Sequence, residues 1–421
     1  MTRFLIAAPN SGAGKTTLTL AIMRILKREG IDFQPAKSGP DYIDPSFHTV
    51  AAGRPSVNLD AWAMQPTQIK NLAGSGNLIV EGAMGLFDGA GLAGHGSAAK
   101  LSNMLSLPVV LVIDAAKIAH SVAAMVKGFA DFDPRITVVG VILNRVGSER
   151  HLNILHASLK NTGIPVFGHL LRSSYFSLPE RHLGLVQAIE NTDLNHWIDT
   201  VADALAPSLD LAALLALTDQ KQYTEFRPSP PPAQHIAVAR DLAFGFSYPH
   251  QLKSWYDAGA TLSFFSPLAN EPAPTDADYI YLPGGYPELH ASVLTTSHIF
   301  KASMVRHASR GTSIYGECGG YMVLGQGVVD AKGVRHAMLG LLPLETSFQQ
   351  QKLHLGYRKL IPLTSHFTGS LNGHEFHYAT TLSAEGPPLF AVTDADDAAL
   401  SDMGLHVGQT CGSFAHIITG H

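Results

Sequence analysis

The stretch RFLIAAPNSGAGKTTLTLAIMRILKREG, residues 3–30, predicts the architecture of the first half of the chain. It contains a short apolar run, then a glycine-rich turn that includes Lys15, then an apolar pattern of helical length that ends at Gly30. A strand, a loop and a helix in this order form phosphate-binding loops, because N–H groups at the helix start point toward the anion. The strict motif has glycine six residues before the lysine, whereas this chain has Pro9 there. We therefore predict a variant phosphate-binding loop.

Short apolar runs recur along the chain and alternate with helix-like stretches. In the first half they include NLIVEGA (77–83), PVVLVIDA (108–115) and TVVGVILN (137–144). Such alternation predicts a parallel sheet with helices on both faces. A polar, proline-rich stretch at 218–234 is typical of a linker, and the same alternation returns after it. The prediction is two α/β domains, residues 1–217 and 235–421, with shorter strands and loops after about residue 326.

The composition is that of a soluble globular protein. The 421 residues are 46% hydrophobic and 15% charged, with a formal net charge of −5, which gives no support to a nucleic-acid-binding surface. Neither a leader pattern nor an apolar run of about 18 residues occurs, so we expect a cytoplasmic protein without a membrane partner. Two cysteines, Cys318 and Cys411, do not make a disulfide framework.

Charged side chains follow two of the expected strands. KSGPDYIDP (37–45) supplies Lys37, Asp41 and Asp44, and EGAMGLFDG (81–89) supplies Glu81 and Asp88. Ligands of open α/β sheets gather at the carboxyl ends of the strands, so both clusters should face the phosphate-binding loop. Each acid alone could equally be a loop cap or turn residue. Together they favour a site for a magnesium-bound nucleotide, because carboxylates hold Mg²⁺ directly or through its waters.

Three residues extend this predicted nucleotide site. Lys15 would neutralise the outer phosphates, and the hydroxyl of Thr16 would reach Mg²⁺. Asn144 closes the run GVILN, where it could contact a base or simply form a turn.

A second motif of chemical interest is YGECGGYMVLG, residues 315–325. A β-branched and aromatic run precedes it and a possible short helix follows, which places Cys318 at the tip of a sharp turn. Enzymes place nucleophiles at such turns, and the flanking glycines allow the tight backbone that the turn needs. The alternative is a small buried apolar residue at a strand end, which is the usual role of a free cysteine.

Seven motifs in order resemble those of the cobyrinic acid a,c-diamide synthase family of cobalamin biosynthesis, across nearly the whole chain. They are KSGPDYIDP, VNLDAW (57–62), EGAMGLFDG, LPGGYPE (282–288), YGECGGYMVLG, HLGYR (354–358) and GHEFHY (373–378). The N-terminal half also resembles dethiobiotin synthetase, a group with the same variant loop. The C-terminal half resembles class I glutamine amidotransferases, which implies an amidotransferase-like α/β fold for that domain.

The resemblance implies a ligase that uses ATP to activate the a and c carboxylates of a corrin ring as acyl phosphates. The residues that it implies for ATP are Ser11, Gly12, Gly14, Lys15, Thr16, Thr17 and Asn144. Those for Mg²⁺ are Thr16, Asp41 and Glu81. Those near the corrinoid substrate and the incoming ammonia are Lys37, Tyr42, Asp44 and Asp88.

For the C-terminal half the resemblance implies that Cys318 attacks the side-chain amide of L-glutamine and that His416, in CGSFAHIITG (411–420), moves the proton. The oxyanion would be held by backbone N–H groups of Gly284, Gly285 and Gly319. Many such amidotransferases have glutamate two residues after the histidine, and here Ile418 stands there, so the third triad member stays open.

Two expectations concern the remaining titratable residues of this half. Glu317, next to the cysteine, is expected to point away from it. His354, His374 and His377 are not expected to bind a metal, because no cysteines or spaced acids complete a site.

Two alternatives remain at the level of function. The same architecture could amidate another tetrapyrrole, such as nickel-sirohydrochlorin, and the residues do not tell a cobalt-containing ring from a metal-free one. A chain of another class, a regulatory P-loop ATPase with a non-catalytic C-terminal domain, would use Cys318 only for packing. The likeness to dethiobiotin synthetase makes a homodimer plausible.

Overall fold

A computed structural model describes residues 1–176, 180–181, 184–185, 187–218 and 230–420. It divides into two compact units, Met1–Phe226 and Arg227–His421. Both are α/β units, as the sequence predicts. The linker predicted at 218–234 falls largely on residues 219–229, which lie outside the described residues.

The first unit is built on one seven-stranded sheet with the order β3-β2-β4-β1-β5-β6-β7. Every neighbouring pair in it is parallel. The strands are β1 (Arg3–Ala7), β2 (Gln34–Ser38), β3 (Val57–Leu59), β4 (Leu78–Glu81), β5 (Val109–Asp114), β6 (Val138–Val146) and β7 (Val166–Leu171). All five residues of β1 and the first five of β5 are buried, as expected for central strands covered on both faces.

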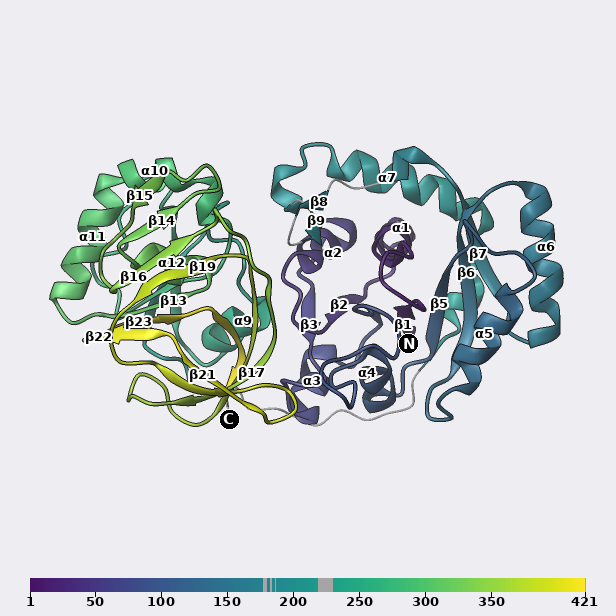
Figure 1. Ribbon diagram of the computed structural model, residues 1–421. Helices are drawn as coiled ribbons and strands as arrows, with labels where there is room; N and C mark the ends of the chain where they lie inside the picture. The colour runs from purple at the N-terminus through teal and green to yellow at the C-terminus, as the bar shows by residue number, and fades with distance from the viewer. Residues whose placement is uncertain (177–179, 182–183, 186, 219–229, 421) are drawn as a thin grey trace. The chain divides into compact units, whose positions relative to one another are not determined.

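Eight helices are described in this unit. They are α1 (Lys15–Arg28), α2 (Asp44–Ala52), α3 (Pro66–Ala73), α4 (Ala98–Leu105), α5 (Val122–Asp131), α6 (Glu149–Leu159), α7 (Leu194–Leu205) and α8 (Leu211–Leu215). Helix α1 packs against both α2 and α7, and Figure 1 shows these three across the sheet from α3 and α4. A short ladder joins β8 (Glu180–Arg181) and β9 (Gly184–Leu185). The loops that connect each strand to the following helix therefore lie at the carboxyl ends of the parallel strands.

The second unit has a six-stranded sheet, β11-β10-β12-β13-β23-β22, in which only the β22–β23 pair is antiparallel. Its strands are β10 (His235–Ala239), β11 (Thr261–Phe265), β12 (Tyr279–Leu282), β13 (Ser313–Glu317), β22 (Leu405–Val407) and β23 (Thr410–Ser413). The helices are α9 (Pro249–Asp257), α10 (Ala291–Thr296), α11 (His298–Ser309) and α12 (Gly319–Leu324).

Two smaller sheets, with orders β15-β14-β16-β19 and β21-β20-β17-β18-β24, complete this unit. Their strands are β14 (Gly327–Val329), β15 (Arg335–Ala337), β16 (Leu344–Ser347), β17 (His354–Pro362), β18 (Leu371–His377), β19 (Thr380–Ala384), β20 (Phe390–Thr393), β21 (Ala399–Met403) and β24 (Ala415–Gly420). The sequence predicts short strands and loops after about residue 326, and most of these strands are short, but β17 has nine residues and β18 has seven.

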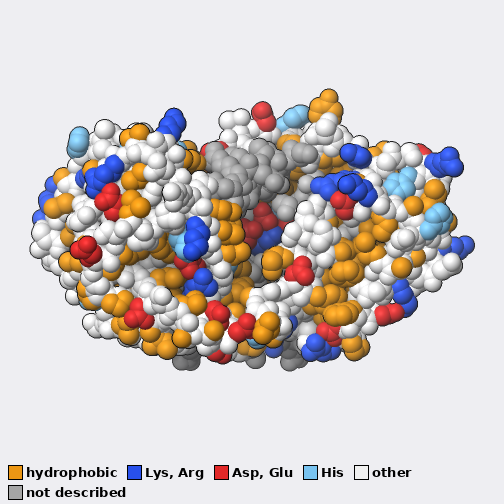
Figure 2. Space-filling view, viewed as in Figure 1, with side chains coloured by type: hydrophobic (Ala, Val, Ile, Leu, Met, Phe, Trp, Pro, Cys, Tyr) orange, Lys and Arg blue, Asp and Glu red, His pale blue; other side chains and the backbone are white. Residues whose placement is uncertain are grey.

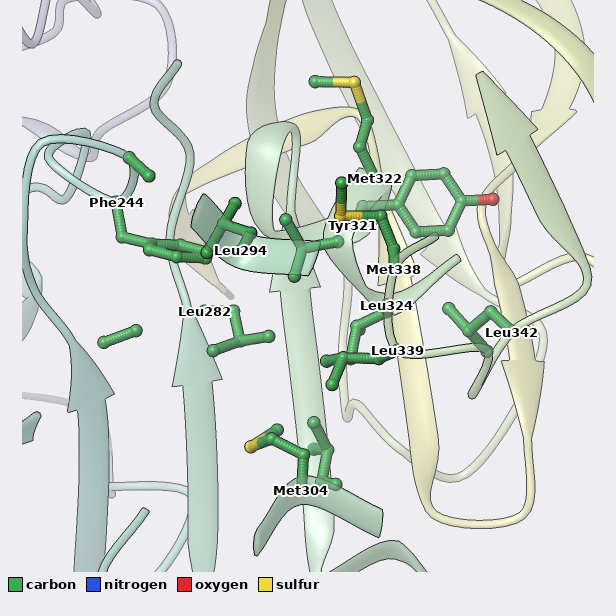
Figure 3. Packing of buried hydrophobic residues seen from close by; sticks show 14 of the residues in the cluster. Phe244, Leu282, Leu294, Met304, Tyr321, Met322, Leu324, Met338, Leu339 and Leu342 are labelled. Carbon is green, nitrogen blue, oxygen red and sulfur yellow. The ribbon is translucent and has the colours of Figure 1, made fainter. Parts of the chain in front are cut away.

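The short helix α12 is held by the core of the second unit. Figure 3 shows Tyr321, Met322 and Leu324 of this helix among Leu282, Met338 and other buried side chains. All six residues of α12 are buried. Packing on this scale holds the turn before the helix in one position, because close-packed cores do not deform freely.

The surface carries charges of both signs. On the face drawn in Figure 2, acidic and basic side chains are interspersed among apolar and uncharged ones in each unit. Among the described helices, none has the length and apolar character needed to cross a bilayer.

Candidate active sites

The first unit has a cavity of about 520 Å³ beside its phosphate-binding loop. The residues that line it are Ser11, Gly12, Gly14, Lys15, Thr16, Thr17, Lys37, Asp41, Asp44, Glu81, Ala83, Met84, Asn144, Arg145, Leu171, Ser173 and Phe176. Eleven of these were singled out from the sequence. They meet because the loops that follow β1, β2, β4 and β6 leave the same edge of the parallel sheet.

A buried charge network forms the floor of this cavity. The ammonium of Lys37 donates to Asp44 Oδ2 at 2.5 Å and to Glu81 Oε1 at 2.9 Å. Thr16 Oγ1 donates to the same Glu81 oxygen at 2.7 Å. Burial by itself would lower the pKa of Lys37, but the carboxylates of Asp44 and Glu81 outweigh it and raise that pKa. Lys37 therefore stays positively charged inside the site.

His48, which the sequence analysis did not single out, completes the network. Its Nε2 lies 2.6 Å from Glu81 Oε2, and both side chains are fully buried. Burial alone would raise the pKa of Glu81, yet the charge of Lys37 and the contact with His48 lower it well below its usual range. His48 lies four residues after Asp44 on α2, and this spacing places both on one helix face. That spacing is the signal that could have identified His48.

Lys15, at the start of α1, and Asp41, in the loop between β2 and α2, line the same cavity. Lys15 Nζ donates to the carbonyl of Asn10 at 3.3 Å. Burial, followed by the nearby charge of Lys37, lowers the pKa of Lys15 to about 8. Asp41 Oδ1 accepts from the N–H groups of Ile43 and Asp44 at 2.8 and 3.1 Å, so Asp41 orders the start of α2.

Two neighbouring residues brace the phosphate-binding loop from β6. Asn144 Nδ2 donates to the carbonyl of Ala13 at 2.9 Å, and Arg145 Nη1 donates to Gly12 at 2.9 Å and to Asp114 Oδ2 at 2.6 Å. The β6–β7 register shifts between Leu143 and Val146, and Arg145 adopts a φ of +57°. This irregularity turns both side chains toward the loop. Arg145 was missed because periodicity does not reveal a register shift.

Two predicted substrate residues do not line the cavity. Asp88 is exposed, and its Oδ2 accepts from the N–H of Gly85 at 3.0 Å, so it shapes the turn after β4. Tyr42 is buried, with 8% of its surface exposed. The structure therefore separates these two from Lys37 and Asp44, which lie in the cavity wall.

Cys318 stands at a strained turn between β13 and α12. Its φ of +46° and ψ of −103° are rare for an L-residue and typical of a nucleophile held at a strand-to-helix elbow. The side chain is buried, and burial raises the pKa of the thiol well above its usual range. The resting thiol is thus protonated, and a nearby base is needed before it can attack.

The side chains of His416 and Cys318 both lie close to Gly284. A Cβ placed on Gly284 would lie 2.2 Å from His416 Cε1, 2.8 Å from its Nε2 and 3.3 Å from Cys318 Cβ. Burial, with smaller contributions from His374 and His377, lowers the pKa of His416 to about 3. A neutral imidazole beside a protonated thiol is the starting arrangement for general base catalysis.

The two glycine-rich loops lie against each other at this place. A Cβ on Gly319 would lie 2.9 Å from the backbone nitrogen of Gly285, so the loop after β12 and the elbow after β13 are in direct contact. The carbonyl of Gly284 accepts from Phe246 at 2.9 Å, which fixes the loop. Gly284, Gly285 and Gly319 thus lie close together beside the cysteine.

A histidine cluster lies on the adjoining strands β17 and β18. Ligand atoms of His354, Glu375 and His377 lie within 4.8 Å of one another, so an acid does accompany these histidines, contrary to expectation. Glu375 already accepts from Arg358 at 2.7 and 2.8 Å and lies 2.9 Å from His377 Nε2. Since this guanidinium compensates the carboxylate charge, the cluster is electrostatically complete without an ion.

Comparison with known proteins identifies a family for each half of the chain. Residues 4–186 match the family model of the CobQ/CobB/MinD/ParA nucleotide binding domain, and residues 235–421 match that of the CobB/CobQ-like glutamine amidotransferase domain. The chain is 50% identical to the hydrogenobyrinate a,c-diamide synthase of Brucella anthropi over 99% of this chain and 98% of that protein. It is 48% identical to the protein of the same name from Rhodobacter capsulatus, over 99% and 98%.

Among solved structures, PurLQS from Thermotoga maritima matches with a TM-score of 0.30 and 15% identity, over 43% of this chain and 86% of that one. The full-length relatives carry the assignment, because the matched region covers both domains. The resemblance found in the sequence is therefore confirmed, and the chain belongs to the a,c-diamide synthase family.

Proposed function

We propose that the chain amidates the a and c carboxylates of hydrogenobyrinic acid, using ATP for activation and L-glutamine as the nitrogen donor. The observation that carries the proposal is the presence of two separate sites in one chain: a cavity lined by Lys15 and Lys37, and the Cys318–His416 pair. The choice of the metal-free ring rests on the name of the relatives that match over nearly their full length.

In the first unit the chemistry is phosphoryl transfer to a carboxylate. We propose that Ser11, Gly12, Gly14, Lys15, Thr16 and Thr17 hold the phosphates of ATP. Lys15 and Lys37 would neutralise the negative charge that spreads over the transferring group. The acyl phosphate would then be open to attack by ammonia, because phosphate is a far better leaving group than a carboxylate oxygen.

The oxygen donors of the cavity suit Mg²⁺, which prefers carboxylate and hydroxyl ligands and keeps several waters. Thr16, Asp41 and Glu81 are the residues proposed to hold it. Both Glu81 oxygens already have protein partners, so contact through a water suits this residue best. When bound, the ion would neutralise phosphate charge. Asn144 would serve ATP mainly by holding the loop. Its Oδ1 accepts from the N–H of Arg145 at 2.9 Å and has a second lone pair that could accept from a base.

For the substrate we propose roles for Lys37, Tyr42, Asp44 and Asp88. Burial, followed by the charge of Asp41, raises the pKa of Asp44 to about 7, which suits a group that accepts a proton from incoming ammonia. Tyr42 and Asp88 lie outside the cavity wall and would act by shaping the loops that carry Asp41 and Ala83.

In the second unit Cys318 would attack the side-chain amide carbon of glutamine. His416 takes the thiol proton and passes it to the departing nitrogen, so ammonia leaves and a glutamyl thioester remains. Water then hydrolyses the thioester, which releases glutamate and restores the thiol. Backbone N–H groups of Gly284, Gly285 and Gly319 would stabilise the oxyanion in both steps.

The direct test offers hydrogenobyrinic acid and, separately, cobyrinic acid to the purified chain with ATP, Mg²⁺ and glutamine labelled with heavy nitrogen in its side-chain amide. Two successive carboxylate-to-amide conversions of the metal-free ring, each incorporating the label, are expected in the product mass. Preference for the cobalt ring would move the proposal to cobyrinic acid. ATP hydrolysis with no product from either ring would favour another tetrapyrrole or the regulatory ATPase.

A substitution at Gly284 should uncouple the two sites. In Gly284→Ala the new methyl group would overlap the ring of His416 and displace it from the thiol. We expect glutamine-dependent amidation to fall by about 10²-fold, since a misplacement of about 1 Å can cost that much. Amidation from ammonium salts should stay within about twofold of the parent chain, because the first unit is unchanged. Steady-state rates with the two nitrogen sources test this, and equal loss of both would contradict it.

Two further proposals concern the location of the protein in the cell and its oligomeric state. We propose a cytoplasmic location and a homodimer, the latter resting only on the likeness to dethiobiotin synthetase. Light scattering after size-exclusion chromatography measures the mass directly, and a monomer at micromolar concentration would contradict the dimer.

A further inference from the structure

The glutamine site lacks an acid at the place where many amidotransferases have one. Ile418 stands two residues after His416, is buried, and offers only its carbonyl, which lies 2.9 Å from His250 Nε2. We propose that Glu317, the residue directly before the nucleophile, is the positioning residue that orients His416 for proton transfer. This inference rests on the proposed function of Cys318.

The carboxylate of Glu317 is held at a defined place. Its Oε2 accepts from the hydroxyl of Tyr281 at 2.6 Å, and its Oε1 accepts from the N–H of Ile417 at 3.0 Å. Ile417 follows His416 directly, so the carboxylate is anchored to the backbone that carries the base. Glu317 and His416 are both fully buried, which shields their interaction from water.

The two nitrogens of His416 face different partners. Nδ1 lies 3.6 Å from Glu317 Oε2, while Cε1 and Nε2 lie against Gly284, next to Cys318 Cβ. A carboxylate at Nδ1 favours the tautomer with its hydrogen on that atom, which leaves the Nε2 lone pair free to take the thiol proton. The distance is longer than a hydrogen bond, and such contacts commonly shorten once the substrate is bound.

The local backbone explains how adjacent residues can act on opposite sides of one ring. Glu317 is the last residue of β13 and pairs with Ser413 of β23, whereas Cys318 departs from the strand at the elbow. The carboxylate of Glu317 thus lies at Nδ1 of His416, whereas Cys318 lies on the side of the ring that carries Cε1 and Nε2.

The charge that Glu317 can supply depends on pH. Burial raises the pKa of Glu317 to about 7, so the group is ionised above neutral pH and can stabilise an imidazolium. Two other carboxylates, those of Glu288 and Glu375, also act electrostatically on the Cys318 thiol. Glu375 is already paired with Arg358 and lies beside His377. The carboxylate of Glu317 lies in ion-pair range of His416.

A rival interpretation is that Glu317 only joins strands, since it links β13 to Tyr281 of β12 and Ile417 of β24. The variant Glu317→Gln separates the two ideas. The amide oxygen of the new glutamine can still accept from the N–H of Ile417, so the link between the strands is largely kept. The glutamine side chain has no charge, however, and its amide group can favour the wrong imidazole tautomer of His416. For a related triad, an acid-to-amide change of this kind costs about 10⁴-fold in kcat.

We expect Glu317→Gln to lower kcat for glutamine hydrolysis by about 10²- to 10³-fold, since the effect should be smaller for a thiol than for a hydroxyl nucleophile. KM for glutamine should change by less than about threefold, because Glu317 does not contact the substrate. Ammonium-dependent amidation reports on the fold and should stay unchanged. Glu317→Asp keeps the charge and should recover part of the rate.

Tyr281→Phe is the matched control, because it removes one hydrogen bond to Glu317 and leaves the carboxylate. Tyr281→Phe should retain most of the glutamine-dependent rate. If Glu317 only joins strands, Tyr281→Phe and Glu317→Gln should instead lose similar thermal stability, and kcat should not change in either variant. The alkylation rate of Cys318 by iodoacetamide, followed by peptide mass, should fall in Glu317→Gln, since base assistance to the thiol is lost. A folded Glu317→Gln with kcat and alkylation rate within threefold of the parent overturns the proposal. Absence of glutamine hydrolysis in the parent chain would instead overturn the proposed function.

Discussion

Cys318→Ala should lose glutamine-dependent amidation by at least about 10³-fold and keep ammonium-dependent amidation within about twofold. The thiol is the atom that would form the thioester, and alanine offers no nucleophile in its place. The first unit, where ammonia attacks the activated carboxylate, is untouched by the change. Rates of product formation with glutamine and with ammonium salts, measured on the same preparation, give the comparison.

Cys411→Ala is the matched control for this experiment. Cys411 lies in β23, is buried like Cys318, and pairs in register with Tyr315 two strand positions before Glu317. A buried thiol of the same unit is removed in both variants, so losses caused by weaker packing should appear in both. An equal loss of both activities in a folded Cys318→Ala protein would argue against two separate sites. Full retention of glutamine use would make Cys318 a packing residue.

Lys15→Ala should stop amidation from either nitrogen source, by about 10²- to 10³-fold, which is the usual cost of removing one group that stabilises transition-state charge. Burial and the neighbouring Lys37 lower the pKa of Lys15 to about 8, so the amine is still mostly charged at neutral pH, and bound phosphate oxygens would raise its pKa again. Glutamine hydrolysis at Cys318 should persist, because that step needs no nucleotide.

Lys27→Ala provides the control on the same helix. Lys27 lies in the last turn of α1 and is exposed, whereas Lys15 begins the helix in the cavity. Its removal should leave both activities near the parent values. Nucleotide binding measured by calorimetry should weaken in Lys15→Ala only. Amidation by Lys15→Ala at more than a tenth of the parent rate would refute the role given to this residue.

Much of the nucleotide site could be predicted from local patterns. Lys37, Asp44 and Glu81 each follow or end an apolar strand, and parallel strands end at one edge of their sheet. Residue type and place in the pattern therefore sufficed to bring them together. For Asp88 the same reasoning predicted the right loop but not the exposed side chain, because the turn that it caps is set by local hydrogen bonds.

Other contacts have no such local signal. His48 meets Glu81 across 33 residues, and Arg145 reaches Gly12 across 133. Neither distance is a period of a helix or strand. The register shift in β6 and the packing of α2 on the sheet decide these contacts.

The sequence by itself determined the strand–loop–helix order, the two α/β domains, the family and the residue types of both sites. These follow from hydrophobic periodicity, turn residues and motif spacing, which act over a few neighbouring positions. Only the tertiary structure decided which side chains meet: that His48 and Lys37 enclose Glu81, and that Glu317 lies at the far nitrogen of His416. The physical reason is that such meetings depend on sheet register and on close packing between distant segments, and neither leaves a periodic trace in the chain.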